Sequence, residues 1–316
     1  MRENFELQNT HAHSRPLIGI VIPTLNAGGQ IERCLAPIIR SPHAGSYKIL
    51  VIDSSSTDDT IDRVKAMGVN FEIIERSKFD HGLTRNYARK KLDTPFVVCM
   101  TQDAYPTSSD AIERLISPLL AGSAQAAYGR QVPRPNSDLL EAYPRGFSYG
   151  PESFDKSWED REKYQLRLYM CSNSFAAYDN AALDRVGGFP KTHFGEDFLA
   201  AMSIVKAGGK IAYRADAVVE HSHSFEFRAE AKRNYQIGVL HSNHPEIFEG
   251  LPKRDRSGGV FARGLLKESY NQAGMWGCSR SFTYLVVRYV SYRIGRCAAK
   301  FSLKCASLPL ISLLYI

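Results

Sequence analysis

Charged side chains follow or adjoin apolar runs at three places in the first third of the chain. Asp53 ends the run ILVI, Arg85 lies in FDHGLTRNYARK, and Asp103 follows FVVCMTQ. Carboxylate oxygens bind hard divalent cations, and arginine binds phosphate through two parallel hydrogen bonds. If these three residues met in one crevice, they could bind a ligand that contains a ribose, a diphosphate and a metal ion.

The apolar runs predict the elements that would bring these residues together. Runs of this length bounded by turn residues are typical of buried parallel strands. Strands are expected at 17–23, 47–53, 71–75, 95–101 and 124–132, with helices at 30–39, 58–68, 83–92 and 108–120. This alternation predicts an α/β fold with a mostly parallel central sheet and helices on both faces. Such sheets bind ligands at the carboxyl ends of their strands, where Asp53 and Asp103 are expected.

Composition limits the class of protein without choosing a partner. The chain has 316 residues, 44% of them hydrophobic, and a formal net charge of +7, which suits an anionic substrate, an anionic membrane surface or nucleic acid. Its six cysteines are scattered without a CxxC pair, which favours reduced residues in a cytosolic protein. No secretory signal is recognisable, and no segment reaches the roughly 18 to 20 apolar residues of a membrane span.

Candidate residues for an acceptor side follow in the second half. Residues 133–162 are rich in Pro, Gly, Tyr and charges, and predict a long irregular loop that could act as a lid. Glu196 and Asp197 follow Gly195 at the start of a predicted helix, where they could balance the helix dipole or supply a general base. His221 and His223 end the run AVVE and could be metal ligands or structural residues.

The last part of the chain predicts a basic amphipathic helix. Residues 280–316 contain six basic residues and no acidic one. On a helix the basic residues Arg293, Arg296, Lys300 and Lys304 share one side, and the apolar positions include Val286, Val290, Ile294 and Leu303. This pattern favours peripheral attachment to an anionic membrane surface, and a solvated helix packed on its own domain is the alternative.

Together these motifs resemble those of the family-2 glycosyltransferases, which have the GT-A fold. VIPTLN and DSSSTDDT match the family's first two strand ends, and the resemblance spans about residues 17–244. FDHGLTRNYA, TQDA and EHSHSFEF with the later NYQIGVLHS resemble, more narrowly, the bacterial rhamnosyltransferases. The D-x-D motif of the family is reduced here to Gln102-Asp103-Ala104, with a single carboxylate.

The resemblance implies roles for particular residues. Asp197 would be the catalytic base beside Glu196, in a GEDF segment that follows RVGGFP. A divalent metal, Mg²⁺ or Mn²⁺, would be held by Asp103 with His221 and His223. The donor nucleotide would be bound by Pro23, Thr24, Asn26, Asp53, Ser55, Arg85, Asn86, Gln102 and Asp103. From the residues alone, Asp53 could equally hold its turn, and Arg85 could equally form a structural salt bridge.

The resemblance also implies an activity and a place for it. The expected reaction is inverting transfer of a sugar, rhamnose from dTDP-rhamnose, to a glycan or lipid-linked acceptor of O-antigen, capsule or exopolysaccharide. The alternatives are another UDP- or GDP-sugar donor, nucleotidyl transfer, and a non-catalytic nucleotide-sugar-binding protein; no nucleic-acid-binding module is recognisable. We expect a cytoplasmic protein, peripheral on the inner membrane. Its parts would be a flexible stretch 1–15, nucleotide and acceptor halves 16–131 and 132–244, and a helical region 245–316.

Overall fold

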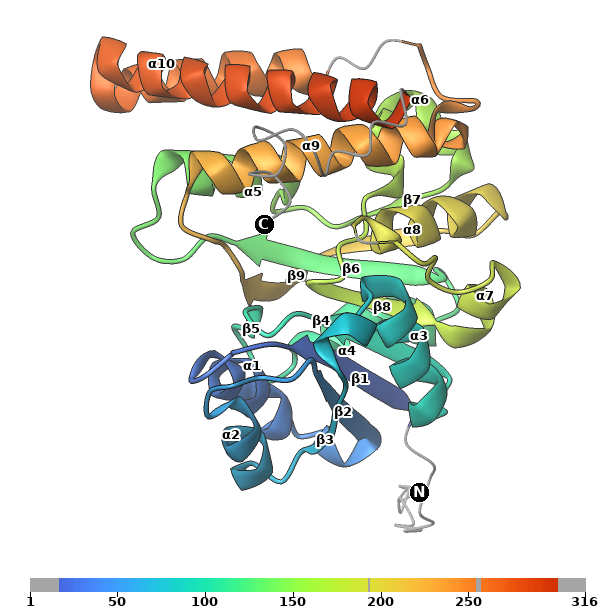
Figure 1. Cartoon of the computed structure of the whole chain (residues 1–316). Helices are drawn as coiled ribbons and strands as arrows, with labels where there is room; N and C mark the ends of the chain where they lie inside the picture. The colour runs from blue at the N-terminus through green and yellow to red at the C-terminus, as the bar shows by residue number, and fades with distance from the viewer. Residues whose placement is uncertain (1–16, 193, 254–256, 301–316) are drawn as a thin grey trace, which may run out of the picture.

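The computed structural model describes residues 17–192, 194–253 and 257–300 (Figure 1). The predicted flexible stretch 1–15 lies outside these residues, as do Leu303 and Lys304 of the predicted basic helix.

A nine-stranded sheet forms the centre of the described structure. Its strands are β1 Ile18–Thr24, β2 Tyr47–Asp53, β3 Asn70–Ile73, β4 Phe96–Met100, β5 Tyr105–Pro106, β6 Ala126–Val132, β7 Phe154–Lys156, β8 Phe175–Asp179 and β9 Ile211–Glu220. They are ordered β3-β2-β1-β4-β8-β6-β9-β5, with β7 also beside β9. Strands β3, β2, β1, β4, β6 and β9 run in one direction, and β8, β5 and β7 run against them. The predicted mostly parallel sheet is confirmed.

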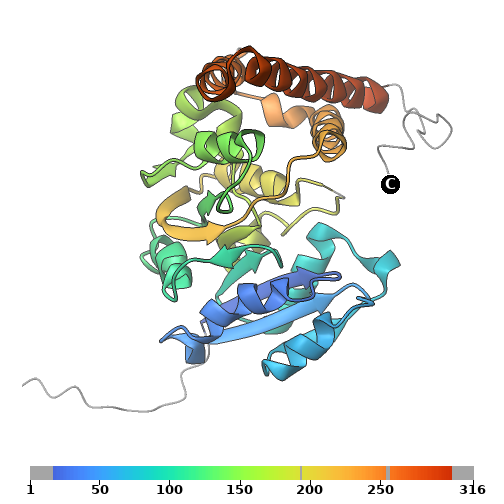
Figure 2. The same ribbon diagram turned by 90° about the vertical axis from the view of Figure 1, so that its left-hand side faces the viewer.

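Helices cover both faces of the sheet, as predicted (Figures 1 and 2). They are α1 Gln30–Ile39, α2 Thr60–Ala66, α3 His81–Leu92, α4 Ala111–Leu120, α7 Asn180–Arg185 and α8 Glu196–Lys206. Side chains alternate across a strand, so Ile20 and Ile22 of β1 join one apolar core and Val21 joins the other. The first core contains α1, α2 and α4, and the second contains α3, α7 and α8.

The prediction of a long irregular loop over 133–162 is wrong. This stretch contains α5 Leu139–Ser148, strand β7 and the turn η3 Trp158–Asp160, and it continues into α6 Arg161–Tyr164 and η4 Gln165–Tyr169. The Asp138 carboxylate caps α5 by accepting a hydrogen bond from the Leu140 backbone N–H at 2.8 Å. Pro144 and Gly146 lie inside α5 and obscure its helical pattern in the sequence.

The C-terminal region is mainly helical over its described residues, as predicted. It comprises α9 Phe227–Asn243, η5 Pro245–Phe248 and α10 Ser257–Lys300. The backbone of α10 leaves helical geometry at Ala273 and Gly274, and the two halves pack side by side, with the Ser269 and Ser281 hydroxyl oxygens 2.6 Å apart. None of the described helices is long and apolar enough to cross a bilayer.

Two glycines bring α9 and α10 into backbone contact. A Cβ atom at Gly238 of α9 would lie 2.2 Å from the Tyr292 carbonyl oxygen, and one at Gly295 of α10 would lie 2.1 Å from that of Tyr235. Any larger side chain at either position would separate the helices. Figure 1 shows α9 between α10 and the sheet, so α10 is the outer layer.

Candidate active site

The loops after β1 and β2 hold each other in place. Thr24 pairs with Asp53 in the sheet register, and its hydroxyl donates to the Asp53 carboxylate at 3.1 Å. Asp53 also accepts from the Ser56 backbone N–H at 2.8 Å, and the Asn26 side-chain oxygen accepts from the Thr57 backbone N–H at 2.8 Å. The buried Asp53 therefore shapes its turn, the structural role that the sequence left open.

The loop after β4 is tied to the loop after β1 by Gln102. The Gln102 side-chain oxygen accepts from the Leu25 N–H at 2.8 Å, and its amide nitrogen donates to the Leu25 carbonyl at 3.1 Å. The edge formed by β2, β1 and β4 thus gathers seven of the residues predicted to bind the donor nucleotide. They are Pro23, Thr24, Asn26, Asp53, Ser55, Gln102 and Asp103.

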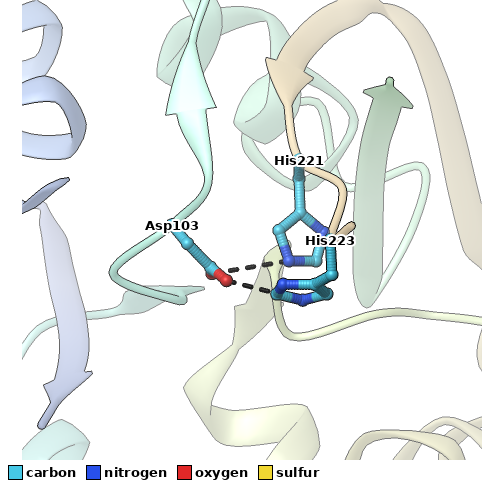
Figure 3. A group of neighbouring side chains, drawn as sticks. All are labelled: Asp103, His221 and His223. Atoms are coloured by element: carbon cyan, nitrogen blue, oxygen red, sulfur yellow. Dashed lines mark ion pairs between the residues drawn. The ribbon is translucent and has the colours of Figure 1, made fainter. Parts of the chain in front are cut away.

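Asp103 faces two histidines that come from the end of β9 (Figure 3). One Asp103 carboxylate oxygen lies 3.4 Å from Nε2 of His221, and the other lies 3.5 Å from Nε2 of His223. The three potential ligand atoms all lie within 4.8 Å of one another. One carboxylate and two imidazoles suit an ion such as Mn²⁺.

The protonation of His221 fits a metal ligand. Its Nδ1 lies 2.9 Å from the side-chain oxygen of the buried Gln131, which accepts a hydrogen bond from the tautomer protonated at Nδ1; in that tautomer Nε2 presents a lone pair. That lone pair faces the Asp103 carboxylate, an arrangement that a cation between them would stabilise. Burial lowers the pKa of both His221 and His223, which favours the neutral imidazoles that bind metals.

Arg85 and Asn86, also predicted to bind the donor nucleotide, contact the segment around the start of α8. The Arg85 guanidinium forms an ion pair with Glu196 at 3.0 Å, and both side chains are buried. The Asn86 amide donates to the Phe189 carbonyl at 2.7 Å and accepts from the Phe189 N–H at 3.0 Å. Both residues therefore join α3 to the segment that leads into α8. Gly82 permits this approach, because a Cβ atom there would lie 1.9 Å from the Pro190 carbonyl oxygen.

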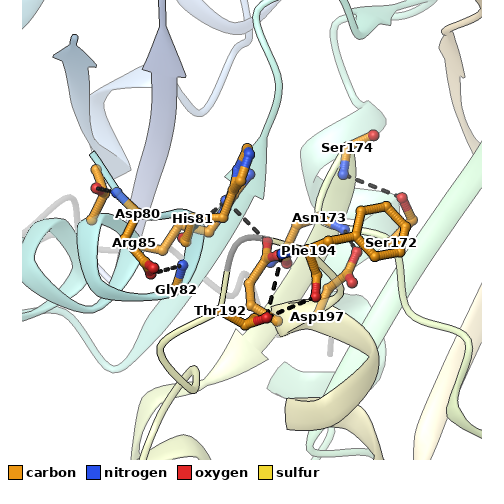
Figure 4. Close-up of polar contacts among 12 residues, drawn as sticks. Asp80, His81, Gly82, Arg85, Ser172, Asn173, Ser174, Thr192, Phe194 and Asp197 are labelled. Carbon is orange, nitrogen blue, oxygen red and sulfur yellow. Dashed lines mark hydrogen bonds and ion pairs between the residues drawn. The ribbon is translucent and has the colours of Figure 1, made fainter. Parts of the chain in front are cut away.

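Asp197 lies in the first turn of α8, next to this ion pair (Figure 4). Its two carboxylate oxygens accept from the backbone N–H groups of Asn173, at 3.0 Å, and Phe198, at 2.7 Å. Burial, and then the negative charge of Glu196, raise the pKa of Asp197 to about 6. A carboxylate of that basicity is suited to accept a proton near neutral pH.

A cavity of about 670 Å³ connects these groups. Its walls include His221 and Gln131 of the metal site, the acids Glu196 and Asp197, and residues of α9 such as His241. A cavity of this size accommodates a sugar and part of a second substrate. The predicted base Asp197 and the predicted metal ligand His221 therefore line the same open cavity.

Four residues of this site were not predicted from the sequence. Asn173 orients both acids, since its backbone binds Asp197 and its side chain donates to Glu196 at 3.0 Å. It precedes β8, whose antiparallel direction places its beginning at the edge where the parallel strands end. Gln131 was detectable, because it lies near the end of a predicted strand. Arg145 and Arg233, which also line the cavity, gave no distinctive sequence signal.

Comparison with solved structures agrees with this fold. A mannosyltransferase from Pyrobaculum calidifontis, solved with GDP-Man and Mn²⁺, superposes with a TM-score of 0.57 at 18% identity, covering 96% of this chain and 85% of that one. Residues 1–349 of TarS from S. aureus superpose with a TM-score of 0.54 at 16% identity, covering 95% and 87%.

Sequence comparison identifies the family. The family model for glycosyl transferase family 2 matches residues 19–187. The O-antigen chain rhamnosyltransferase of Salmonella anatum is 32% identical over 283 residues, covering 89% of this chain and 90% of that protein. The O-antigen chain rhamnosyltransferase of Salmonella typhimurium is 34% identical over 286 residues, covering 88% and 89%. This chain therefore belongs to glycosyl transferase family 2 and is a glycosyltransferase of the GT-A fold.

Proposed function

We propose that this protein transfers rhamnose from dTDP-rhamnose to a glycan or lipid-linked acceptor in O-antigen synthesis. The observation that carries the proposal is its similarity, over nearly the full length of both chains, to two O-antigen chain rhamnosyltransferases. The expectation of a rhamnosyl donor is thus independent of the cavity, whose geometry supports glycosyl transfer in general.

Asp197 acts as the general base in the proposed reaction. It accepts the proton of an acceptor hydroxyl as that oxygen attacks the anomeric carbon of the donor. The bond between the anomeric carbon and the phosphate oxygen breaks at the same time, and its electron pair leaves with the nucleoside diphosphate. The attack comes from the face opposite the leaving group, so the anomeric configuration inverts.

Glu196 and Arg85 position this base. Their ion pair anchors the first turn of α8 to α3. The N–H groups of Asn173 and Phe198 then orient the Asp197 carboxylate within the cavity. Of the two adjacent acids, Asp197 is therefore the better candidate for the base.

Asp103, His221 and His223 would hold a divalent metal ion, Mg²⁺ or Mn²⁺. When bound, such an ion neutralises charge on the departing diphosphate. Gln131 would keep His221 in the tautomer that binds metal, through the contact to Nδ1. Thr24, Asp53 and Gln102 would shape the nucleoside-binding loops of the donor site.

The outer face of α10 would attach the protein to an anionic membrane surface from the cytoplasmic side. Apolar side chains point outward along its second half: Met275, Trp276, Phe282, Val286, Tyr289, Val290 and Ile294 are all exposed. Arg293 lies among them, with its guanidinium over the Tyr289 ring. Arg296 departs from the predicted basic side, because it turns inward over the Phe248 ring. An apolar stripe with a flanking cation fits a lipid surface that carries acidic headgroups.

The donor proposal is tested with a panel of nucleotide sugars and a polyprenyl-diphosphate-linked saccharide acceptor. Release of the nucleoside diphosphate is measured with dTDP-rhamnose, UDP-glucose and GDP-mannose, with Mn²⁺ or Mg²⁺ present. We expect turnover with dTDP-rhamnose at least about tenfold above the others, the effect of a few correctly placed contacts. Faster turnover of another donor would assign that donor in place of dTDP-rhamnose. Donor binding without release of a nucleoside diphosphate would point to a non-catalytic role.

A further inference from the structure

Two arginines line the cavity outside the ion pairs described so far. Arg145 of α5 is half-buried, and Arg233 of α9 is an exposed residue whose side chain reaches the cavity wall. Among the described residues, no carboxylate lies within ion-pair distance of either guanidinium; the nearby acids Glu141 and Glu230 are paired with Arg134 and Arg288, each at 3.0 Å or less. Burial and the charge of Arg233 lower the pKa of Arg145, so its environment favours an anion.

These arginines lie near the candidate metal site. Arg145 and His221 line the same cavity, and the Arg145 charge acts on Asp103 and on both histidines. Arg85, by contrast, is committed to Glu196. The cationic side chains available to an anion beside the metal site therefore include Arg145 and Arg233.

Arg145 is held by a fixed helix. Asp138 caps the start of α5 and also forms an ion pair with Arg280 of α10, at 2.5 Å. The Tyr143 ring packs edge-on against Phe261 of α10, with the ring centres 5.3 Å apart. Because α5 is anchored at these points, the backbone that carries Arg145 is already in place when an anion binds.

We propose that Arg145 and Arg233 form a diphosphate-binding site in the cavity. Paired guanidinium groups bind phosphate oxygens through charge-assisted hydrogen bonds. The proposal deepens the transferase function and rests on it, since the reaction offers two sources of a diphosphate. One is the nucleoside diphosphate that leaves the donor, and the other is the linkage of a lipid-bound acceptor.

Calorimetry with inorganic pyrophosphate in EDTA tests the site without metal or sugar. We expect the full-length protein to bind pyrophosphate, and Arg145→Ala and Arg233→Ala each to weaken binding at least about tenfold, the scale of one charge-assisted contact. Arg145→Lys should lose less. Arg114→Ala is the matched control, because Arg114 pairs with Asp110 on an exposed face of α4.

Thermal unfolding separates binding from folding. Neither arginine has an acidic partner among the described residues, so both alanine variants should keep the melting temperature of the wild type. Absence of pyrophosphate binding by the wild type, or equal affinity in Arg145→Ala, Arg233→Ala and Arg114→Ala, would overturn the proposal. Pyrophosphate carries no sugar or nucleoside. If the rhamnose assay fails while pyrophosphate binding still depends on the arginines, the proposed rhamnosyl donor is wrong and the diphosphate-binding site stands.

Displacement identifies the source of the diphosphate. Pyrophosphate bound to the wild type is titrated with dTDP and, separately, with farnesyl diphosphate. Displacement by dTDP assigns the arginines to the leaving group, and displacement by farnesyl diphosphate assigns them to the lipid-linked acceptor. Displacement by neither would contradict a substrate role and overturn the proposal.

Discussion

The Arg85 guanidinium lies 3.0 Å from the Glu196 carboxylate, and this buried pair separates the properties of two adjacent acids. Glu196 is held by Arg85 and by the Asn173 side chain. Asp197, one residue later, forms no ion pair with any described residue, and its carboxylate accepts hydrogen bonds from two backbone N–H groups. Neighbours of nearly identical chemistry thus acquire different tasks, one structural and one suited to proton transfer.

Replacement of Asp197 by Asn is expected to abolish transfer and spare donor binding. The amide cannot accept the acceptor proton, and loss of a general base lowers rate by about 10²- to 10⁴-fold. Turnover is followed by nucleoside diphosphate release, and donor affinity by calorimetry. Asp184→Asn, an exposed acid on α7, is the control. Near-wild-type turnover in Asp197→Asn would reject the base assignment.

The pH dependence of kcat/KM should report the same carboxyl group. With a pKa of about 6, Asp197 is protonated at lower pH and can no longer accept a proton. Activity should therefore fall about tenfold per pH unit below about pH 6 and level off above it. A profile measured from pH 4.5 to 8.5 that stays flat down to pH 5 would contradict this prediction.

Replacing only Arg85 or only Glu196 should destabilise the fold more than replacing both residues together. Arg85→Met or Glu196→Met leaves one buried charge without its partner, which costs about 3–5 kcal/mol, whereas the double substitution removes both charges. Urea unfolding of the four proteins measures the coupling. Additive losses in the double variant would mean that the pair contributes nothing as a unit.

Asp103→Ala should remove the metal-dependent part of nucleoside diphosphate binding. Gln131→Leu should weaken Mn²⁺ affinity by about 10- to 100-fold, because the amide orients the His221 imidazole. Calorimetry with dTDP, with and without Mn²⁺, measures both effects. His43→Ala, at an exposed histidine, is the control. Mn²⁺-dependent affinity that survives in Asp103→Ala would place the ion elsewhere.

Vesicle binding should depend on the outer stripe of α10. The double variant Trp276→Ser/Phe282→Ser removes two exposed apolar side chains, 78% and 62% accessible, and should bind phosphatidylglycerol vesicles at least about tenfold more weakly in sedimentation. Ile73→Ser, at an exposed apolar residue of β3, is the control. Unchanged sedimentation with concentration-dependent dimerisation would assign the stripe to a second copy of the chain.

Strand ends were the part of this site that the sequence could predict. Apolar runs locate β1, β2, β4 and β9, so Thr24, Asp53, Asp103 and His221 are all expected at a single sheet edge. The contacts that these side chains make were not predictable, because each contact joins segments that lie far apart in the sequence. Arg85 meets Glu196 only because Gly82 lets α3 approach the Pro190 carbonyl, and Asn173 reaches both acids only because β8 runs antiparallel.

The glycine contact between α9 and α10 fixes the distance from the outer face of α10 to the cavity. Gly238 and Gly295 fix the spacing of the two helices, which for packed helices is about 8–10 Å between axes. Helix α9 lines the cavity, and helix α10 carries the outward apolar stripe. If the stripe rests on a bilayer, the Asp197 carboxylate, the proposed base, stays at a constant height above the lipid headgroups. Acceptors would then be selected by reach, since the hydroxyl that receives the sugar must lie that far from its lipid anchor.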